Sequence, residues 1–376
     1  MILGWGCRLC LVVTLAGGAM ADPTYTQLTF DDLQGWRDDD HQAAFDVFTN
    51  TCRDLDDPQW SVLCNFAKTN PEPRGFFEKF FHPVLIEDGE PMLFTGYFEP
   101  QLPGSREKRA SYRYPIYGVP DDLISGEPYF TRREIDEDQP LADRGLELAW
   151  LTDPVDLFFL QVQGSGRISL PDGSMMRVGY GGKNGRSYSS VGMALVDRGI
   201  FEPHQVSAAV IRNWVRQNRD EGRALLWENE SYVFFREVSE VPADQGPLGA
   251  MNRSITEGRS IAIDPAFVTL GAPVWIEKEG AEPLNRLMIA QDTGSAIKGA
   301  QRADIFFGTG DQAGQADRGR NTDIGVLAEP AGDLRNRAAE AFGSVGRRAI
   351  VQPARDHEEF LAAQPESLVV ARTAQP

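Results

Sequence analysis

Three aspartates in the last third of the chain have the surroundings expected of catalytic carboxyl groups. Asp264, Asp292 and Asp304 each lie beside a run of alternating apolar residues and a Pro- or Gly-containing turn, in the segments SIAIDPAFV, LMIAQDTGSAIKG and RADIFFGTG. This pattern predicts carboxylates at strand ends, where β-rich proteins tend to build clefts. The three side chains are therefore the leading candidates for catalysis.

Asp304 has the surroundings of a general acid. Its neighbours Ile305, Phe306 and Phe307 are apolar, and apolar surroundings disfavour the charged form of a carboxyl group and raise its pKa. A carboxyl that stays protonated near neutral pH can donate a proton in catalysis. The alternative is an aspartate on the outer face of a strand, in contact with water.

Asp292 begins the tetrapeptide Asp-Thr-Gly-Ser, which is the signature around the paired aspartates of pepsin-like proteases. Those enzymes need two carboxylates that share one proton, so a chain must contain the motif twice or dimerise. The motif occurs once in this sequence. An aspartic protease therefore remains only as an alternative.

Metal and nucleophile chemistry are disfavoured by residue spacing. The four histidines (His41, His82, His204 and His357) are scattered, and none has a second His or Cys at the spacing of a zinc site. The aspartates form no D-x-D-x-D-G calcium loop. The serine in Gly164-Ser165-Gly166 is not in a G-x-S-x-G elbow, and this segment fits a turn or a set of backbone amides that faces a ligand. We expect no metal and no cofactor.

The composition limits the class of partner. The 376 residues include 37 basic and 55 acidic side chains, for a formal net charge of −18. No Lys/Arg-rich run is present to release counterions from a phosphate backbone, so nucleic acid is not an expected partner. An anionic polymer would have to be held by stacking and hydrogen bonds.

The N-terminus predicts an exported protein. Arg8 precedes the apolar run LCLVVTLAGG, and Ala19-Met20-Ala21 forms a small-residue cleavage site, so residues 1–21 are predicted to be a signal peptide. The apolar run is too short for a spanning helix. Cys7 precedes the run and Cys10 lies at its start, whereas a lipid-acceptor cysteine would follow it, so a lipoprotein fits poorly.

Cys52 and Cys64 are the cysteines that remain after removal of the signal peptide. An even pair in an oxidising compartment predicts a disulfide. The alternative is two buried free thiols with a structural role.

Helices are expected before about residue 86 and short strands after it. Residues 38–86 contain two apolar stripes at helical spacing, and the second, Phe76, Phe77, Phe80 and Phe81, is predicted to be core. From Met92, short apolar runs that include DLFFLQVQGSG predict strands, with a hairpin turn at Pro171-Asp172-Gly173. Helices are expected at 189–199 and 206–218, strands again from 246 to 330, and a mostly irregular tail from Val351.

The motifs, taken together, resemble the membrane-bound lytic transglycosylase A family of peptidoglycan-cleaving enzymes, with the three-aspartate domain that it shares with other cell-wall proteins. The matching pieces run in order over residues 92 to 328 and cover most of the mature chain. They are FTGYFEP, YPIYGVP, FFLQVQGSGRI, VGYGGKNGRSYSSVG, GPLGAMN, IDP, QDTGSAIKG and ADIFFGTG.

The resemblance implies a mainly β fold with some α: a double-psi β-barrel domain, an inserted second β-rich domain, and a substrate groove between them. The length of the chain also fits two domains. The expected divisions are 22–100 for an N-terminal helical part and the start of the barrel, 101–245 for the insert, 246–330 for the three-aspartate segment, and 331–376 for a C-terminal helix and tail.

The resemblance also implies roles for particular residues. By position, Asp304 matches the family's single catalytic acid/base, Asp292 a nearby aspartate that supports catalysis, and Asp264 the third of the set, which we count with the substrate-binding residues. Four further positions are expected to line the groove: Gly96, Tyr97, Gln161 and Gln163.

The implied substrate is the β-1,4 bond between N-acetylmuramic acid and N-acetylglucosamine. One carboxyl group, acting as acid and then as base, would leave a 1,6-anhydromuramic acid end without using water. The expected partners are peptidoglycan glycan strands and other cell-wall enzymes, in the periplasm of a Gram-negative bacterium. Outer-membrane association stays open because a usable lipid-acceptor cysteine is absent. A non-catalytic glycan-binding protein is the second alternative.

Overall fold

The computed structural model describes residues 23–55, 58–89, 92–278, 283–310, 312–314, 346–349 and 367–373. The expected signal peptide, the end of the strand-rich segment expected up to residue 330, and most of the expected C-terminal helix and tail lie outside these residues. No helix within the described ranges is long and apolar enough to cross a membrane.

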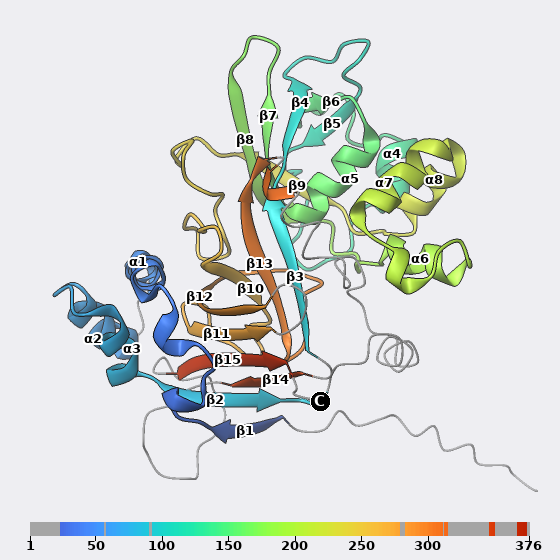
Figure 1. Ribbon diagram of the computed structural model, residues 1–376. Coiled ribbons are helices and arrows are strands. Elements are labelled where there is room, and N and C mark those ends of the chain that lie inside the picture. The colour runs from blue at the N-terminus through green and yellow to red at the C-terminus, as the bar shows by residue number, and fades with distance from the viewer. Residues whose placement is uncertain are drawn as a thin grey trace, which may run out of the picture.

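The described strands form two sheets at different ends of the molecule (Figure 1). The first has nine strands in the order β1-β2-β14-β15-β11-β12-β10-β13-β3, and the second has six in the order β5-β6-β4-β7-β8-β9. The first sheet contains β1 (Thr24–Gln27), β2 (His82–Glu87), β3 (Leu93–Glu99), β10 (Ser260–Ile263), β11 (Pro273–Lys278), β12 (Leu284–Thr293), β13 (Arg302–Thr309), β14 (Gly346–Ala349) and β15 (Ser367–Thr373). The second contains β4 (Gln101–Ser105), β5 (Tyr114–Tyr117), β6 (Glu147–Leu151), β7 (Ser165–Ser169), β8 (Met175–Lys183) and β9 (Val233–Glu237).

The helices divide between the two sheets (Figure 1). The first group, beside the nine-stranded sheet, comprises α1 (His41–Thr51), α2 (Pro58–Ala67) and α3 (Pro73–Phe80). The second group, beside the six-stranded sheet, comprises α4 (Arg132–Glu137), α5 (Pro154–Gln163), α6 (Val191–Asp197), α7 (Ala208–Gln217) and α8 (Arg219–Trp227). This architecture confirms the expected mainly β fold with some α-helix.

Most of the expected elements are confirmed, including the helices near 189–199 and 206–218 and the hairpin at Gly173, whose φ is 84°. Two expectations are wrong. The helical stretch ends at Phe80 and gives way to β2, and the segment FFLQVQ belongs to α5 and not to a strand. The described residues near the C-terminus add two strands that were not expected, β14 before Val351 and β15 within the tail.

Local capping explains why the apolar run in α5 is a helix. The Asp153 side chain accepts a hydrogen bond from the Val155 amide, Pro154 occupies the first turn, and Gly164 ends the helix with a φ of 75°. An N-cap acid, an N1 proline and a left-handed C-terminal glycine are strong helix boundaries. These boundaries decide the structure of a short apolar run whose periodicity fits both helix and strand.

The largest apolar cluster lies between the first group of helices and the nine-stranded sheet. Phe76, Phe77 and Phe81 are at most 1% exposed and pack against Phe45 and Phe48 at ring-centroid distances of 5.1 to 6.3 Å. Such aromatic contacts add to the free energy gained by burial. The expectation of a core stripe is confirmed for these three, and the fourth residue, Phe80, is partly buried and packs against the cluster.

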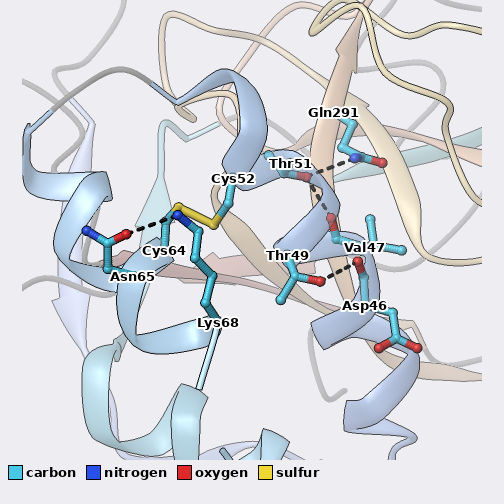
Figure 2. Close-up of a disulfide and its surroundings, with 9 residues drawn as sticks. All are labelled: Asp46, Val47, Thr49, Thr51, Cys52, Cys64, Asn65, Lys68 and Gln291. Atoms are coloured by element: carbon cyan, nitrogen blue, oxygen red, sulfur yellow. Dashed lines mark hydrogen bonds between the residues drawn. A yellow bond between two sulfur atoms is a disulfide. The ribbon is translucent and has the colours of Figure 1, made fainter. Parts of the chain in front are cut away.

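The predicted disulfide between Cys52 and Cys64 is present and joins the end of α1 to α2 (Figure 2). Next to it, the Thr51 hydroxyl donates to the Val47 carbonyl and accepts from the Gln291 side-chain amide at 2.9 Å. Gln291 immediately precedes Asp292 on β12, so these bonds tie α1 to the strand that carries this aspartate.

Replacement of both cysteines by alanine should lower the free energy of unfolding by about 3 kcal/mol, because the bond closes a short loop and restricts the unfolded chain. Urea denaturation of the double variant measures the loss. Wild-type protein under reducing conditions should unfold at the same midpoint as the variant. An unchanged midpoint in both would contradict a stabilising role for the bond.

Candidate active site

Four strands of the first sheet place Asp304 and Asp292 in one row. Asp304 on β13 is paired with Thr95 on the parallel strand β3, and on its other side with Ala262 on β10. Ala262 is in turn paired with Asp292 on β12. Paired residues share a face of the sheet, so both carboxyl groups stand on the same face with one small side chain between them.

Alternation along β13 separates this face from the core. Ala303, Ile305 and Phe307 belong to the large cluster under the helices, whereas Phe306 packs with Tyr97 and Ala262 in a separate small cluster. Asp304 has the same parity as Phe306, because side chains alternate along a strand. The apolar neighbours that drew attention to Asp304 in the sequence therefore lie largely on the opposite face of the sheet.

Asp304 is partly buried, and burial raises the pKa of its carboxyl group above the ordinary range. The positive charge of Arg302 and a hydrogen bond from the Thr95 hydroxyl to Oδ1, at 2.6 Å, act in the opposite direction and lower this pKa. Desolvation is the largest of these effects. A carboxyl in this environment is suited to donate a proton near neutral pH.

Asp292 differs from Asp304 because three hydrogen bonds hold its carboxylate. Oδ1 accepts from the backbone amides of Ala250 and Thr293, each at 2.9 Å, and Oδ2 accepts from the Tyr97 hydroxyl at 2.8 Å. Burial raises the pKa of Asp292 to about 6, although these bonds work to lower it. Asp292 is thus fixed in orientation by donors that favour its charged form.

Tyr97→Phe should lower kcat about 10-fold, because it removes one of these donors and raises the pKa of Asp292 further. Initial rates on glycan strands, the substrate class that the resemblance implies, measure the effect. Tyr129→Phe is the matched control, since the Tyr129 hydroxyl donates to the exposed Asp122 at 2.9 Å. A Tyr97→Phe enzyme as fast as the control would show that this bond does not matter to the reaction.

A cavity of about 310 Å³ opens over the row of aspartates. One wall comes from the nine-stranded sheet and includes Gly96, Tyr97, Asp292 and Asp304. The other wall comes from helices α4, α5 and α7 beside the six-stranded sheet, with Arg132, Phe158, Phe159, Gln161, Gln163 and Arg212, and from Tyr188 in the loop before α6. A cavity between two units, with aromatic walls and a few polar groups, is a common setting for a ligand site.

The two expected glutamines enter this cavity from the end of α5. Gln163 accepts a hydrogen bond from the Phe98 amide at 3.0 Å, which joins α5 to β3. Gln161 is 5% exposed, and its amide oxygen accepts from Arg132. Six of the seven site residues expected from the sequence line the cavity: Gly96, Tyr97, Gln161, Gln163, Asp292 and Asp304.

Asp264 is the expected site residue that the structure does not bring into the cavity. Its side chain is buried, and its two oxygens accept from the amides of Ala266 and Gly299. Lys298 lies 3.5 Å from Oδ1. Asp264 therefore anchors the segment that follows Asp292, and its expected contact with substrate is not supported by its position.

Sequence reasoning did not find Thr95, Ala262, Arg132 or Arg302, which also line the cavity. Thr95 lies one residue before Gly96 and Tyr97, inside the motif FTGYFEP, so the motif contained the signal. Arg132 lies outside every quoted motif and reaches Gln161 only through the tertiary fold.

Two family models match separate segments of the chain. Residues 93–236 match the model described as the MltA specific insert domain, and residues 259–327 match the 3D domain. Membrane-bound lytic murein transglycosylase A of Vibrio cholerae is 34% identical over 235 residues, which are 59% of this chain and 61% of that protein. The chain thus matches about three fifths of the length of this relative.

Solved structures share the fold. The crystal structure of a membrane-bound lytic murein transglycosylase from Agrobacterium tumefaciens has a TM-score of 0.70 and 32% identity, and the match covers 78% of this chain and 94% of that one. The structure of E. coli MltA with bound chitohexaose has a TM-score of 0.62 and 27% identity, with 77% and 89% covered.

Proposed function

We propose that this chain, which belongs to the MltA family of membrane-bound lytic murein transglycosylases, cleaves the glycan strands of peptidoglycan by a non-hydrolytic route. The bond broken is the β-1,4 link between N-acetylmuramic acid and N-acetylglucosamine. The observation that carries the proposal is the pair of unequal carboxyl groups in the cavity, of which one can exchange a proton and the other is held by three donors.

In the proposed reaction, Asp304 acts twice. Its carboxyl group first donates a proton to the leaving glycosidic oxygen as the bond to C1 of muramic acid breaks. The resulting carboxylate then takes the proton of the C6 hydroxyl group of the same sugar, whose oxygen forms a new bond to C1. The product carries a 1,6-anhydro ring, the acid is regenerated, and no water is consumed.

Asp292 supports this scheme as a fixed negative group and not as a second base. Its oxygens already accept from Tyr97, Ala250 and Thr293, which restricts their use in activating a water molecule. Its charge can stabilise the positive charge that develops at C1 in the transition state. A hydrolase would need the second carboxylate to be available to water.

The same geometry argues against an aspartic protease. The paired carboxyl groups of those enzymes lie about 3 Å apart and share a proton. Here β10 separates the strands of Asp292 and Asp304, so their Cα atoms are about 10 Å apart, or two strand spacings. Each carboxyl group also has hydrogen-bond partners of its own.

The proposed substrate is an extended glycan, which the aromatic and amide side chains of the cavity would hold by stacking and hydrogen bonds. The solved relative with bound chitohexaose supports this choice of ligand class. We further propose that the protein acts in the periplasm, in agreement with the signal peptide predicted at residues 1–21, and that other cell-wall enzymes are its partners.

Mass analysis of the fragments released from purified peptidoglycan tests the proposal. Fragments with 1,6-anhydromuramic acid ends are expected. Fragments with reducing ends would indicate a hydrolase. The absence of any released fragment, with binding retained, would indicate a glycan-binding protein.

A further inference from the structure

The hydroxyl group of Thr95 donates a short hydrogen bond to the Asp304 carboxyl. The two residues are directly paired across β3 and β13, and Thr95 Oγ1 donates to Asp304 Oδ1 at 2.6 Å. Thr95 is 5% exposed, so water has little access to this bond. The strand register fixes both backbones, and it therefore also fixes the position of the hydroxyl group.

This contact distinguishes the two oxygens of Asp304. A carboxylic acid carries its proton on one oxygen only, and Oδ1 is engaged as an acceptor. The proton of the acid therefore belongs on Oδ2. When Asp304 has donated this proton, its carboxylate is charged, and a hydrogen bond to a charged group is stronger than one to a neutral group.

We propose that Thr95 is a positioning residue that directs proton exchange to Oδ2 of Asp304 and stabilises the carboxylate that exists between the donation and the abstraction of a proton. The proposal rests on the proposed function and adds a residue to its mechanism. Thr95 acts through Asp304 and needs no contact with the sugar.

Other charged and titratable groups also face Asp304. Arg302 on the same strand lowers the pKa of Asp304 through its charge, and it donates to the backbone carbonyls of Leu93 and Ala303. Tyr97 on β3 and Asp292 on β12 also interact electrostatically with Asp304, while the residue paired with Asp304 on β10 is the uncharged Ala262. Arg132 and Arg212 line the same cavity from the opposite wall. A change at Thr95 alone leaves all of these groups in place.

Thr95→Val tests the proposal because it removes the hydroxyl group and keeps the shape of the side chain. We expect kcat on soluble glycan strands to fall about 10- to 100-fold with little change in KM, since a charge-assisted hydrogen bond is lost. The bond lowers the pKa of Asp304. Its loss should therefore move the basic limb of the kcat/KM profile to higher pH.

Two variants make the test specific. Thr95→Ser keeps a hydroxyl group and should restore both the rate and the pH profile. Thr309→Val makes the same substitution at a second threonine of the same sheet, at the end of β13. Its hydroxyl donates to Glu99 at 2.8 Å, and it does not line the cavity. Thr309→Val should leave the pH profile unchanged. If Thr95→Val does not fold, Thr95→Cys replaces it, because a thiol is a weak donor.

Three results would overturn the proposal: a wild-type kcat and basic limb in Thr95→Val, an equal loss in Thr95→Ser, or a shift of the basic limb to lower pH. The last result would mean that the hydroxyl group accepts a hydrogen bond from the protonated carboxyl of Asp304 and does not donate one to it. Wild-type enzyme that yields no anhydro ends would refute the proposed function itself. Anhydro ends with an unaffected Thr95→Val enzyme would refute this inference alone.

Discussion

Asp304→Asn should release anhydro-ended fragments at least about 10³-fold more slowly than the wild-type enzyme. General acid or base assistance is typically worth about 10² to 10⁴-fold, and Asp304 is assigned both roles. An asparagine side chain keeps an oxygen that can accept from the Thr95 hydroxyl, so the geometry of the row should persist. Initial rates of fragment release, followed by mass analysis, measure the effect.

The loss should not come from unfolding. Burial raises the pKa of Asp304, so the folded state binds this proton more tightly than the unfolded chain. As the pH rises above the pKa that Asp304 has in the unfolded chain, its raised pKa in the folded state lowers the free energy of unfolding. The variant with the uncharged asparagine avoids this loss, so at neutral pH it should be at least as stable as wild type. A variant that unfolds earlier than wild type, or that retains more than a tenth of the activity, would contradict the assignment.

Glu99→Ala should lower the free energy of unfolding by about 3 to 5 kcal/mol, because it leaves buried positive charges without their counter-ion. Glu99 is fully buried at the point where the chain passes from β3 to β4. Its carboxylate lies 2.9 Å from Arg167 Nε and 2.8 Å from Arg177 Nε, on the strands of the second sheet. Both arginines also donate to the Gln245 carbonyl, on the segment that returns to the first sheet.

Glu237→Ala is the matched control for this prediction. Glu237 forms an ion pair with Arg106 at 2.5 Å, but both side chains are 41% or more exposed. Exposed pairs contribute about 0 to 1 kcal/mol, so the control should unfold almost as wild type does. Urea denaturation compares the two variants. A loss in Glu99→Ala no larger than that in Glu237→Ala would mean that the buried cluster does not hold the two sheets together.

The strands that carry the site could be predicted from the sequence, because there the alternation of apolar and polar residues and the turn residues that follow predict the same strand ends. In β10, β12 and β13, runs such as SIAI and DIFF end at Gly, Pro or Asp, and the structure confirms each of these strands. The run FFLQVQ misled because a short apolar segment buried on most sides has no clear period, and its caps at Asp153 and Gly164 were the better signal. The strand Ser367–Thr373 was missed because only its pairing partners, which are far away in the sequence, favour it.

The candidate site could be predicted only in part, because motifs identify residues and not their neighbours. Asp304 and Asp292 stood out by residue type and setting, but their unequal environments depend on Tyr97 and Thr95, which lie about 200 residues away in the sequence. Asp264 shared the pattern of the other two and yet holds a turn, since its amide donors come from Ala266 and Gly299. Strand register, which no motif contains, separates these roles.

Digestion of peptidoglycan in ¹⁸O-labelled water tests the central claim, that one carboxyl group cleaves the glycan without water. The account predicts that the new muramic acid ends are 1,6-anhydro rings and carry no label, because the oxygen that bonds to C1 comes from C6 of the same sugar. Labelled reducing ends as the main product would contradict it, because they would show that water, activated by a second base, attacks C1.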